Sequence, residues 1–122
     1  MNELLATWLG RLGESADPET WLVSREPSPI AEVVRGRTAD PRLGLVHLLI
    51  TDGRLESANL ELTDPPHLDE LTAELGAGSH AWAPGGFENV LWTLDAARIV
   101  ADLINHDRVA RIWVGPAFSM PD

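Results

Sequence analysis

Hydrophobic residues recur at helical spacing over the first twelve positions of the chain. They share one face of a helical projection: Leu4, Leu5, Trp8, Leu9 and Leu12. A single apolar stripe of this kind is typical of a helix that packs one face on a core. Asn2 suits the N-cap, and Gly13 suits the left-handed residue that ends many helices. The pattern predicts an amphipathic helix over residues 2–13.

A β-hairpin is the clearest pattern in the middle of the chain. The apolar run over residues 43–51 ends at Asp52-Gly53, a pair favoured in two-residue hairpin turns. Residues 54–62 return with alternation of apolar and polar positions. One face has Ala58, Leu60 and Leu62, and the other has Ser57, Asn59 and Glu61. This period of two predicts an antiparallel strand with one face in the core.

Two further helices are predicted after this hairpin. The first covers residues 64–75, with Asp64 as N-cap, proline at the first helical position and Gly76 at its end. The second covers residues 87–106, where apolar residues occupy most of the helical circumference. Its narrow polar stripe contains Glu88, Asp95, Arg98, Asp102 and His106. So wide an apolar surface predicts a central helix buried on more than one side.

The hydrophobic pattern predicts the secondary structure of the other segments less clearly. Residues 109–114 are predicted to form a final strand that Gly115-Pro116 ends. Residues 30–37 fit a short helix or a strand, and residues 77–86 fit a loop or a short edge strand. The order of elements predicts one small α+β domain over residues 1–122. Its sheet is antiparallel or mixed, and its helices pack mainly on one face of that sheet.

Composition narrows the chemistry that this domain can perform. The chain has 122 residues, no cysteine, and arginine as its one kind of basic side chain besides histidine. Disulfides, thiolate metal sites, cysteine nucleophiles and lysine Schiff bases are therefore excluded. Gly85-Gly86 lacks the spacing of a phosphate or dinucleotide loop, so we expect no cofactor. Arginine without lysine, beside abundant alanine, leucine and proline, suggests a GC-rich bacterial genome.

Net charge and hydropathy indicate the compartment and the class of partner. The formal net charge of −10 argues against nucleic acid and against an anionic membrane surface. No apolar run approaches the roughly 18 residues of a membrane-spanning helix. The first residues lack the positive charge of a secretory leader. We therefore expect a cytoplasmic protein.

Acidic residues gather in one part of the chain. Residues 55–97 contain no arginine and eight carboxylates. One interpretation is a docking face for a basic protein, where carboxylates steer association and a tryptophan acts as the buried anchor. The other is that these residues only increase solubility. The docking interpretation assigns partner binding to Glu56, Glu61, Asp69, Glu70, Glu74, Trp82, Glu88 and Asp95. Trp82 is equally compatible with a place in the core.

Catalytic and metal-binding patterns are weaker than this charge pattern. Asp102 and His106 have the spacing of two ligands on one helix face, but no third ligand accompanies them. The same spacing fits an exposed ladder of ion pairs that also includes Arg98. Ser57 and His47 are a conceivable nucleophile and base, yet no nucleophile motif supports them. We therefore predict no catalytic and no metal-binding residues.

The segment Gly85-Gly86-Phe87-Glu88-Asn89-Val90-Leu91-Trp92-Thr93-Leu94-Asp95-Ala96 resembles barstar-like ribonuclease inhibitors. Residues 67–71, followed by Leu75-Gly76, are similar to their acidic helix. Residues 94–113 are similar to the closing helix and strand of other bacterial toxin-immunity proteins. The resemblance implies that Glu88 and Asp95 lie on a helix facing the basic site of a partner, with Trp92 packed behind them.

These observations predict an inhibitor or immunity-type protein that blocks a basic toxin or enzyme with an acidic face. The alternative is a small-molecule-binding module or a small cofactor-free enzyme, with a pocket between sheet and helices. In that case His47, His80 or Trp82 would lie at the pocket mouth. An enclosed pocket would favour the alternative, and a solid core would disfavour it.

Overall fold

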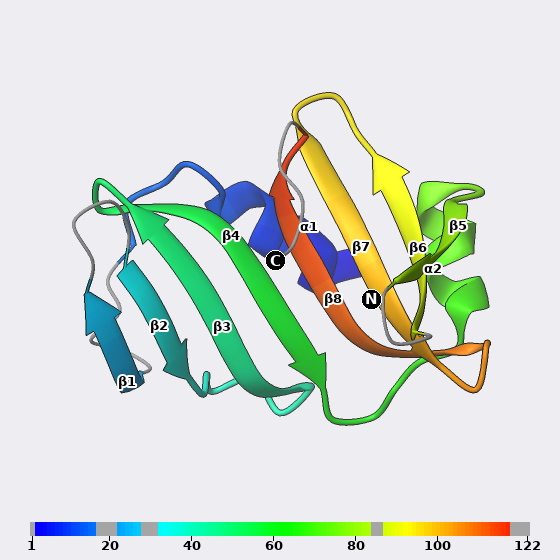
Figure 1. The fold of residues 1–122 in the computed structure, drawn as a ribbon, viewed down its shortest axis with the longest axis horizontal. Helices are drawn as coiled ribbons and strands as arrows, with labels where there is room; N and C mark the ends of the chain where they lie inside the picture. Colours follow the sequence, from blue (N-terminus) through cyan, green and yellow to red (C-terminus); the bar gives the residue numbers. More distant parts are fainter. Residues whose placement is uncertain (1, 17–21, 28–31, 84–86, 118–122) are drawn as a thin grey trace.

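The computed structural model describes residues 2–16, 22–27, 32–83 and 87–117. Two short helices and eight strands make up this part of the chain (Figure 1). In chain order they are α1 (Asn2–Arg11), β1 (Leu22–Pro27), β2 (Glu32–Gly36), β3 (Leu43–Thr51), β4 (Arg54–Leu62), α2 (Leu68–Leu75), β5 (Ser79–Ala83), β6 (Phe87–Thr93), β7 (Ala97–Ile104) and β8 (Arg108–Pro116).

The eight strands form one twisted, fully antiparallel sheet in the order β1-β2-β3-β4-β8-β7-β6-β5. Strands β1–β4 make one meander and β5–β8 make a second, and the β4–β8 pair joins them in the centre. In Figure 1, α1 lies behind the middle of the sheet and α2 lies behind its β5–β6 end. The predicted α+β arrangement of packed helices is wrong, because the sheet dominates the structure and the helices are two short additions to it.

The predicted long helix over residues 87–106 is also wrong. This segment forms β6, a turn and β7, which pair through five antiparallel positions from Asn89↔Asp102 to Thr93↔Arg98. In β6 the side chains of Val90 and Trp92 point into the core. In β7 Ile99, Ala101 and Leu103 do the same, whereas Val100 is buried on the other face. The apolar residues spread around the helical wheel are therefore the two faces of strands with a period of two.

Several other predictions are confirmed or decided. The first helix ends at Arg11, and Gly13 has a φ of +80°. The hairpin at Asp52-Gly53 forms, with φ values of 53° and 73°, as a type I′ turn requires. The pattern left residues 30–37 and 77–86 undecided. The first segment contains strand β2, and the second contains the edge strand β5.

The core lies between the sheet and the two helices. Leu4, Leu5 and Trp8 of α1 and Leu71 of α2 belong to the same cluster as the inward residues of β2, β3, β4, β6, β7 and β8. Trp113 is also buried, but it lies on the opposite face of the sheet, where its cross-strand neighbours are Asn59 and Val100. Trp8 and Trp92 both belong to the core cluster.

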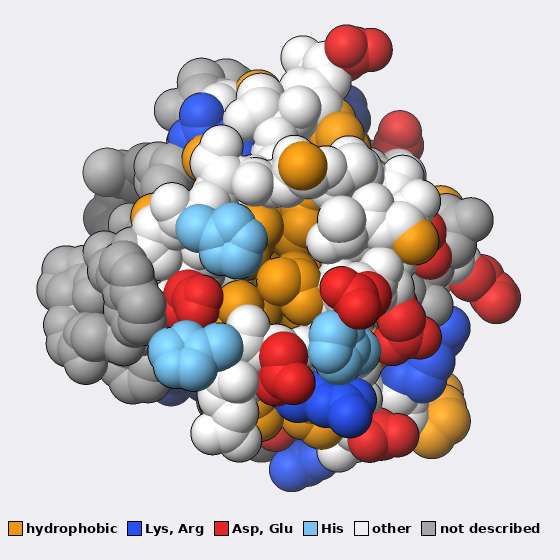
Figure 2. Space-filling view, turned by 90° about the vertical axis from the view of Figure 1, so that its right-hand side faces the viewer, with side chains coloured by type: hydrophobic (Ala, Val, Ile, Leu, Met, Phe, Trp, Pro, Cys, Tyr) orange, Lys and Arg blue, Asp and Glu red, His pale blue; other side chains and the backbone are white. Residues whose placement is uncertain are grey.

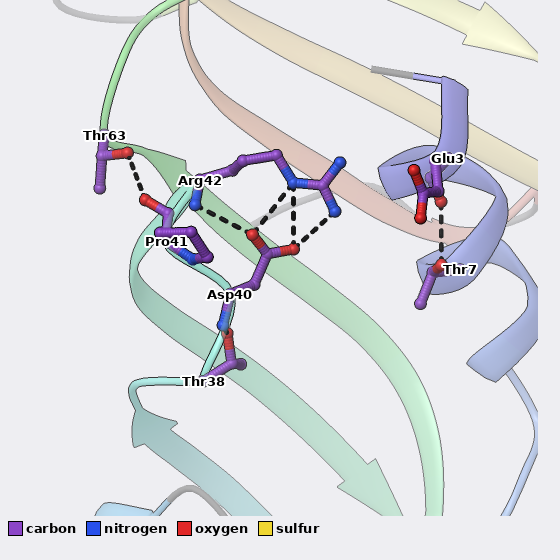
Figure 3. Close-up of polar contacts among 7 residues, drawn as sticks. All are labelled: Glu3, Thr7, Thr38, Asp40, Pro41, Arg42 and Thr63. Carbon is purple, nitrogen blue, oxygen red and sulfur yellow. Dashed lines mark hydrogen bonds and ion pairs between the residues drawn. The ribbon is translucent and has the colours of Figure 1, made fainter.

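The connection between β2 and β3 is organised by one carboxylate, as Figure 3 shows. Asp40 accepts hydrogen bonds from the backbone N–H of Arg42, at 2.9 Å, and from its guanidinium, at 2.7 Å. The Arg42 side chain and backbone together hold the pKa of the Asp40 carboxyl below its ordinary value. The hydroxyl of Thr63 donates to the carbonyl of Pro41, at 2.8 Å. These contacts tie the start of β3 to the end of β4.

Candidate functional site: an acidic end of the sheet

The eight predicted partner-binding residues lie in different places on the fold. Three of them are exposed on α2: Asp69, Glu70 and Glu74. Glu88 and Trp82 are cross-strand neighbours on β6 and β5. Glu56 and Glu61 lie on β4, and Asp95 lies in the turn between β6 and β7. The structure therefore places four of the carboxylates on α2 and β6, and leaves three carboxylates elsewhere.

The turn between β7 and β8 joins α2 to β6 at one end of the sheet. The backbone N–H of Leu68 donates to the carbonyl of Asp107, at 2.8 Å, which holds the start of α2 against this turn. The indole N–H of Trp92 donates to the carbonyl of Gly76, at 2.9 Å, which holds the end of α2 against β6. We call the surface formed by Asp69, Glu70, Glu74, Glu88 and Asp107 the acidic end.

Figure 2 views the molecule from this side. Acidic and histidine side chains border a hollow on several sides, its visible floor is hydrophobic, and arginine side chains lie below it. The combination resembles the usual anatomy of a protein interface, in which a polar rim surrounds an apolar centre.

Glu88 is the most enclosed carboxylate of the acidic end. Its side chain is 13% exposed, and it lies between two more exposed histidines. Oε1 lies 3.0 Å from Nδ1 of His106, and Oε2 lies 3.7 Å from Nδ1 of His80. Each carboxylate oxygen faces a histidine. One histidine lies in the turn between β7 and β8 and the other on β5, so contacts from two parts of the fold fix the orientation of this carboxylate. A protonated histidine at either position would offset its charge.

His67 performs the capping role that the sequence assigned to Asp64. It is the N-cap of α2, and its Nδ1 accepts a hydrogen bond from the backbone N–H of Asp69, at 3.1 Å. Its Nε2 lies 3.7 Å from a carboxylate oxygen of Asp107. The predicted cap is wrong because Pro65-Pro66 is followed by a bridge between His67 and Arg108, which delays the helix to Leu68.

His67, His106 and Asp107 were not predicted as site residues. His106 and Asp107 were placed in or beside a long helix, whereas Asn105 and His106 form a tight turn with φ values of 54° and 68°. Asn favours such a left-handed conformation, but the usual Asn-Gly signature of the turn is missing here. A prediction of two strands in this region would have placed both residues at this end of the sheet.

The remaining candidate carboxylates lie away from the acidic end. Asp95 follows the end of β6, whereas Glu88 is near its start. Glu56 accepts a hydrogen bond from the Thr51 hydroxyl, at 3.0 Å, on the neighbouring strand. Glu61 is exposed opposite Arg111 of β8. The side chain of Trp82 lies outside the described part of the structure, so whether it is exposed or buried stays a prediction.

Two depressions formed by the described residues are open to solvent. One of about 470 Å³ lies beside the acidic end and is lined by residues that include Leu4, Arg42, Glu70 and Arg108. A smaller one, of about 240 Å³, lies on the sheet face opposite the helices and brings His47 and Ser57 to a common pocket with Trp113. Burial, Arg35 and Arg111 lower the pKa of His47, and Glu61 opposes them.

Among the described residues, no three or more His, Asp and Glu side chains gather with a geometry that could hold a metal ion. Neither α1 nor α2 has the length and apolar character needed to cross a membrane. Comparisons of the chain with protein-family models, with curated proteins and with solved structures find no match.

Proposed function

We propose that this protein is an inhibitor or immunity-type protein that binds a basic protein partner through its acidic end. The observation that carries the proposal is the acidic and histidine side chains beside an apolar hollow at this end of the sheet (Figure 2), where Asp69, Glu70 and Glu74 are exposed on α2 and Glu88 lies on β6. Carboxylates in this arrangement steer a basic partner during encounter, and the apolar centre contributes desolvated contact. A cytoplasmic location belongs to the same proposal.

The α2 carboxylates and Glu88 have different roles in this proposal. The side chain of Asp69 is 88% exposed, and Glu70 and Glu74 are also exposed, so they act mainly on the association rate. Glu88 is held by His106 and His80, so it loses less conformational freedom when a basic side chain binds it. Glu56, Glu61 and Asp95 lie outside this contact.

The test is capture from a lysate of the source organism, washed at low and at high salt. The acid-end variant is D69N/E70Q/E74Q, and the matched control is E56Q/E61Q/D95N. Each removes the same charges, from one aspartate and two glutamates, so the two differ in place and not in net charge. We expect wild type and control to retain a basic protein at low salt, and the acid-end variant to lose it.

Equal retention by the acid-end variant and the wild type would contradict the proposal, as would capture of an acidic protein. The alternative, a small-molecule-binding module or cofactor-free enzyme, has weaker support. Its expected pocket is an enclosed one between sheet and helices, whereas that space holds the packed core and the pockets described above are open.

A further inference from the structure

The two edges of the sheet differ in how well they are protected against pairing with another strand. β1 forms one edge, and its pairing with β2 shifts register between Leu22 and Ser24 and ends at Pro27. A bulge and a proline are two devices by which proteins block an edge. β5 forms the other edge, and it pairs with β6 in unbroken register from Ser79↔Leu91 to Ala83↔Phe87. β5 contains no proline.

The outer side of β5 offers backbone hydrogen-bonding groups. In an antiparallel strand, alternate residues direct their N–H and C=O groups away from the neighbouring strand. The described hydrogen bonds outside the strand pairs include none from residues 79–83, and no described strand lies beyond β5. Ser79, His80 and Ala81 are exposed. Within the described part of the chain no segment pairs with this edge, so a strand can add to it.

The acidic end lies next to this edge and determines which strand would fit. Glu88 is on β6, one strand from the edge, and His80 on β5 lies 3.7 Å from it. α2, with Asp69, Glu70 and Glu74, lies behind the same two strands (Figure 1). A strand that adds to β5 would run one strand away from Glu88, so arginine or lysine side chains on it would be attracted.

We propose that the partner adds an extended basic segment to the outer edge of β5 as a ninth strand, with its basic side chains toward the acidic end. This inference rests on the proposed function, because it specifies how the basic partner would bind. Strand addition supplies affinity through backbone hydrogen bonds, and alternate side chains supply specificity. A second copy of this chain is disfavoured as the occupant, since it would bring two acidic ends together.

The test uses synthetic peptides of about ten residues on the full chain, so that no variant has to fold. The first peptide alternates arginine and threonine and is labelled for fluorescence anisotropy. The second has the same arginines but a proline at two central threonines, which removes backbone donors and strand geometry. The third replaces arginine by glutamate. Amide hydrogen exchange of Ser79, His80 and Ala81 is measured with each peptide at low salt.

We expect the alternating basic peptide to bind at least about tenfold more tightly than the proline-containing one and to slow exchange at β5. The glutamate peptide should not bind. If both basic peptides bind equally and β5 exchange is unchanged, strand addition is wrong while docking at the acidic end stands. If exchange slows at β1 instead, strand addition at β5 is also wrong. Failure of both basic peptides to bind would contradict this inference and the proposed function together.

Discussion

Oε1 of Glu88 lies 3.0 Å from Nδ1 of His106, which joins β6 to the turn between β7 and β8. The two residues are 18 positions apart in the chain. The same turn also holds the start of α2 through Asp107 and Leu68. The acidic end is thus built around one turn that contacts both elements carrying its carboxylates.

Two substitutions of Glu88 distinguish the contribution of its hydrogen bond to stability from that of its charge. Glu88→Ala removes both and should lower the free energy of unfolding by about 1 kcal/mol, since one side-chain hydrogen bond is lost. Glu88→Gln keeps an acceptor for a protonated Nδ1 and should cost less. Urea unfolding of the three proteins at neutral pH measures the difference. A Glu88→Ala variant as stable as the wild type would show that this contact does not stabilise the turn.

His67 offers a test of the start of α2. His67→Ala removes the acceptor for the backbone N–H of Asp69 and should cost about 1 kcal/mol, within the usual range for lost N-caps. His67→Asn supplies another good N-cap acceptor and should retain most of the stability. Thermal or urea unfolding measures both. Equal loss in the two variants would indicate that His67 acts through contacts other than the cap.

Gly78 and Gly10 differ in the space around them, so alanine substitutions at the two positions can be compared as a test of packing. A Cβ at Gly78 would clash with Val90 Cγ1 and lie 2.9 Å from Trp92 Cε2, whereas a Cβ at Gly10 meets nothing within 4 Å. Gly78→Ala should therefore destabilise the protein by about 1–3 kcal/mol. Gly10→Ala lies in α1 and should stabilise it by roughly 0.5–1 kcal/mol. Urea midpoints that move in the same direction for both variants would contradict this description.

His47 should give stability a dependence on pH. Burial first, and then Arg35 and Arg111, lower its pKa, so the folded state binds a proton less readily than the unfolded chain. Stability is therefore full above the ordinary histidine pKa of about 6.5 and falls as the pH drops from there through the lower folded value. His47→Gln should flatten this fall, as measured by urea unfolding between about pH 7.5 and 5.

Glu61 supplies the check on the cause of this shift. Glu61 raises the pKa of His47 against the effect of the two arginines. Glu61→Gln should therefore lower the pKa of His47 further, as followed by the NMR titration of its ring protons. A rise of that pKa in the variant would show that the charges around His47 are assigned wrongly.

Local sequence predicted the elements whose turns have strong signatures. Asp52-Gly53 located the central hairpin, and the stripe from Leu4 to Leu12 located α1, because each depends on neighbours in the chain. The helix predicted over residues 87–106 failed for a physical reason. Both faces of β6 and β7 contain apolar residues, and the turn between them at Leu94-Asp95-Ala96 lacks glycine and proline, so the period of two was hidden.

The acidic end could be predicted in part. The arginine-free span identified Asp69, Glu70, Glu74 and Glu88, because a shortage of basic residues is visible in the sequence. His67, His106 and Asp107 join them only through the pairing of β7 with β8 and the contact of α2 with their turn. The β4–β8 pair that joins the two meanders likewise depends on contacts distant in sequence, which no local pattern specifies.

Docking at the acidic end is tested most directly by the association rate with the captured partner, measured by stopped flow over a range of salt concentrations. Wild type and the E56Q/E61Q/D95N control should associate rapidly at low salt and slow down as salt screens their charges. The D69N/E70Q/E74Q variant should associate roughly tenfold more slowly at low salt and depend less on salt. An acid-end variant that matches the wild type in rate and salt dependence, or a control that slows as much as the acid-end variant, would contradict docking at the acidic end.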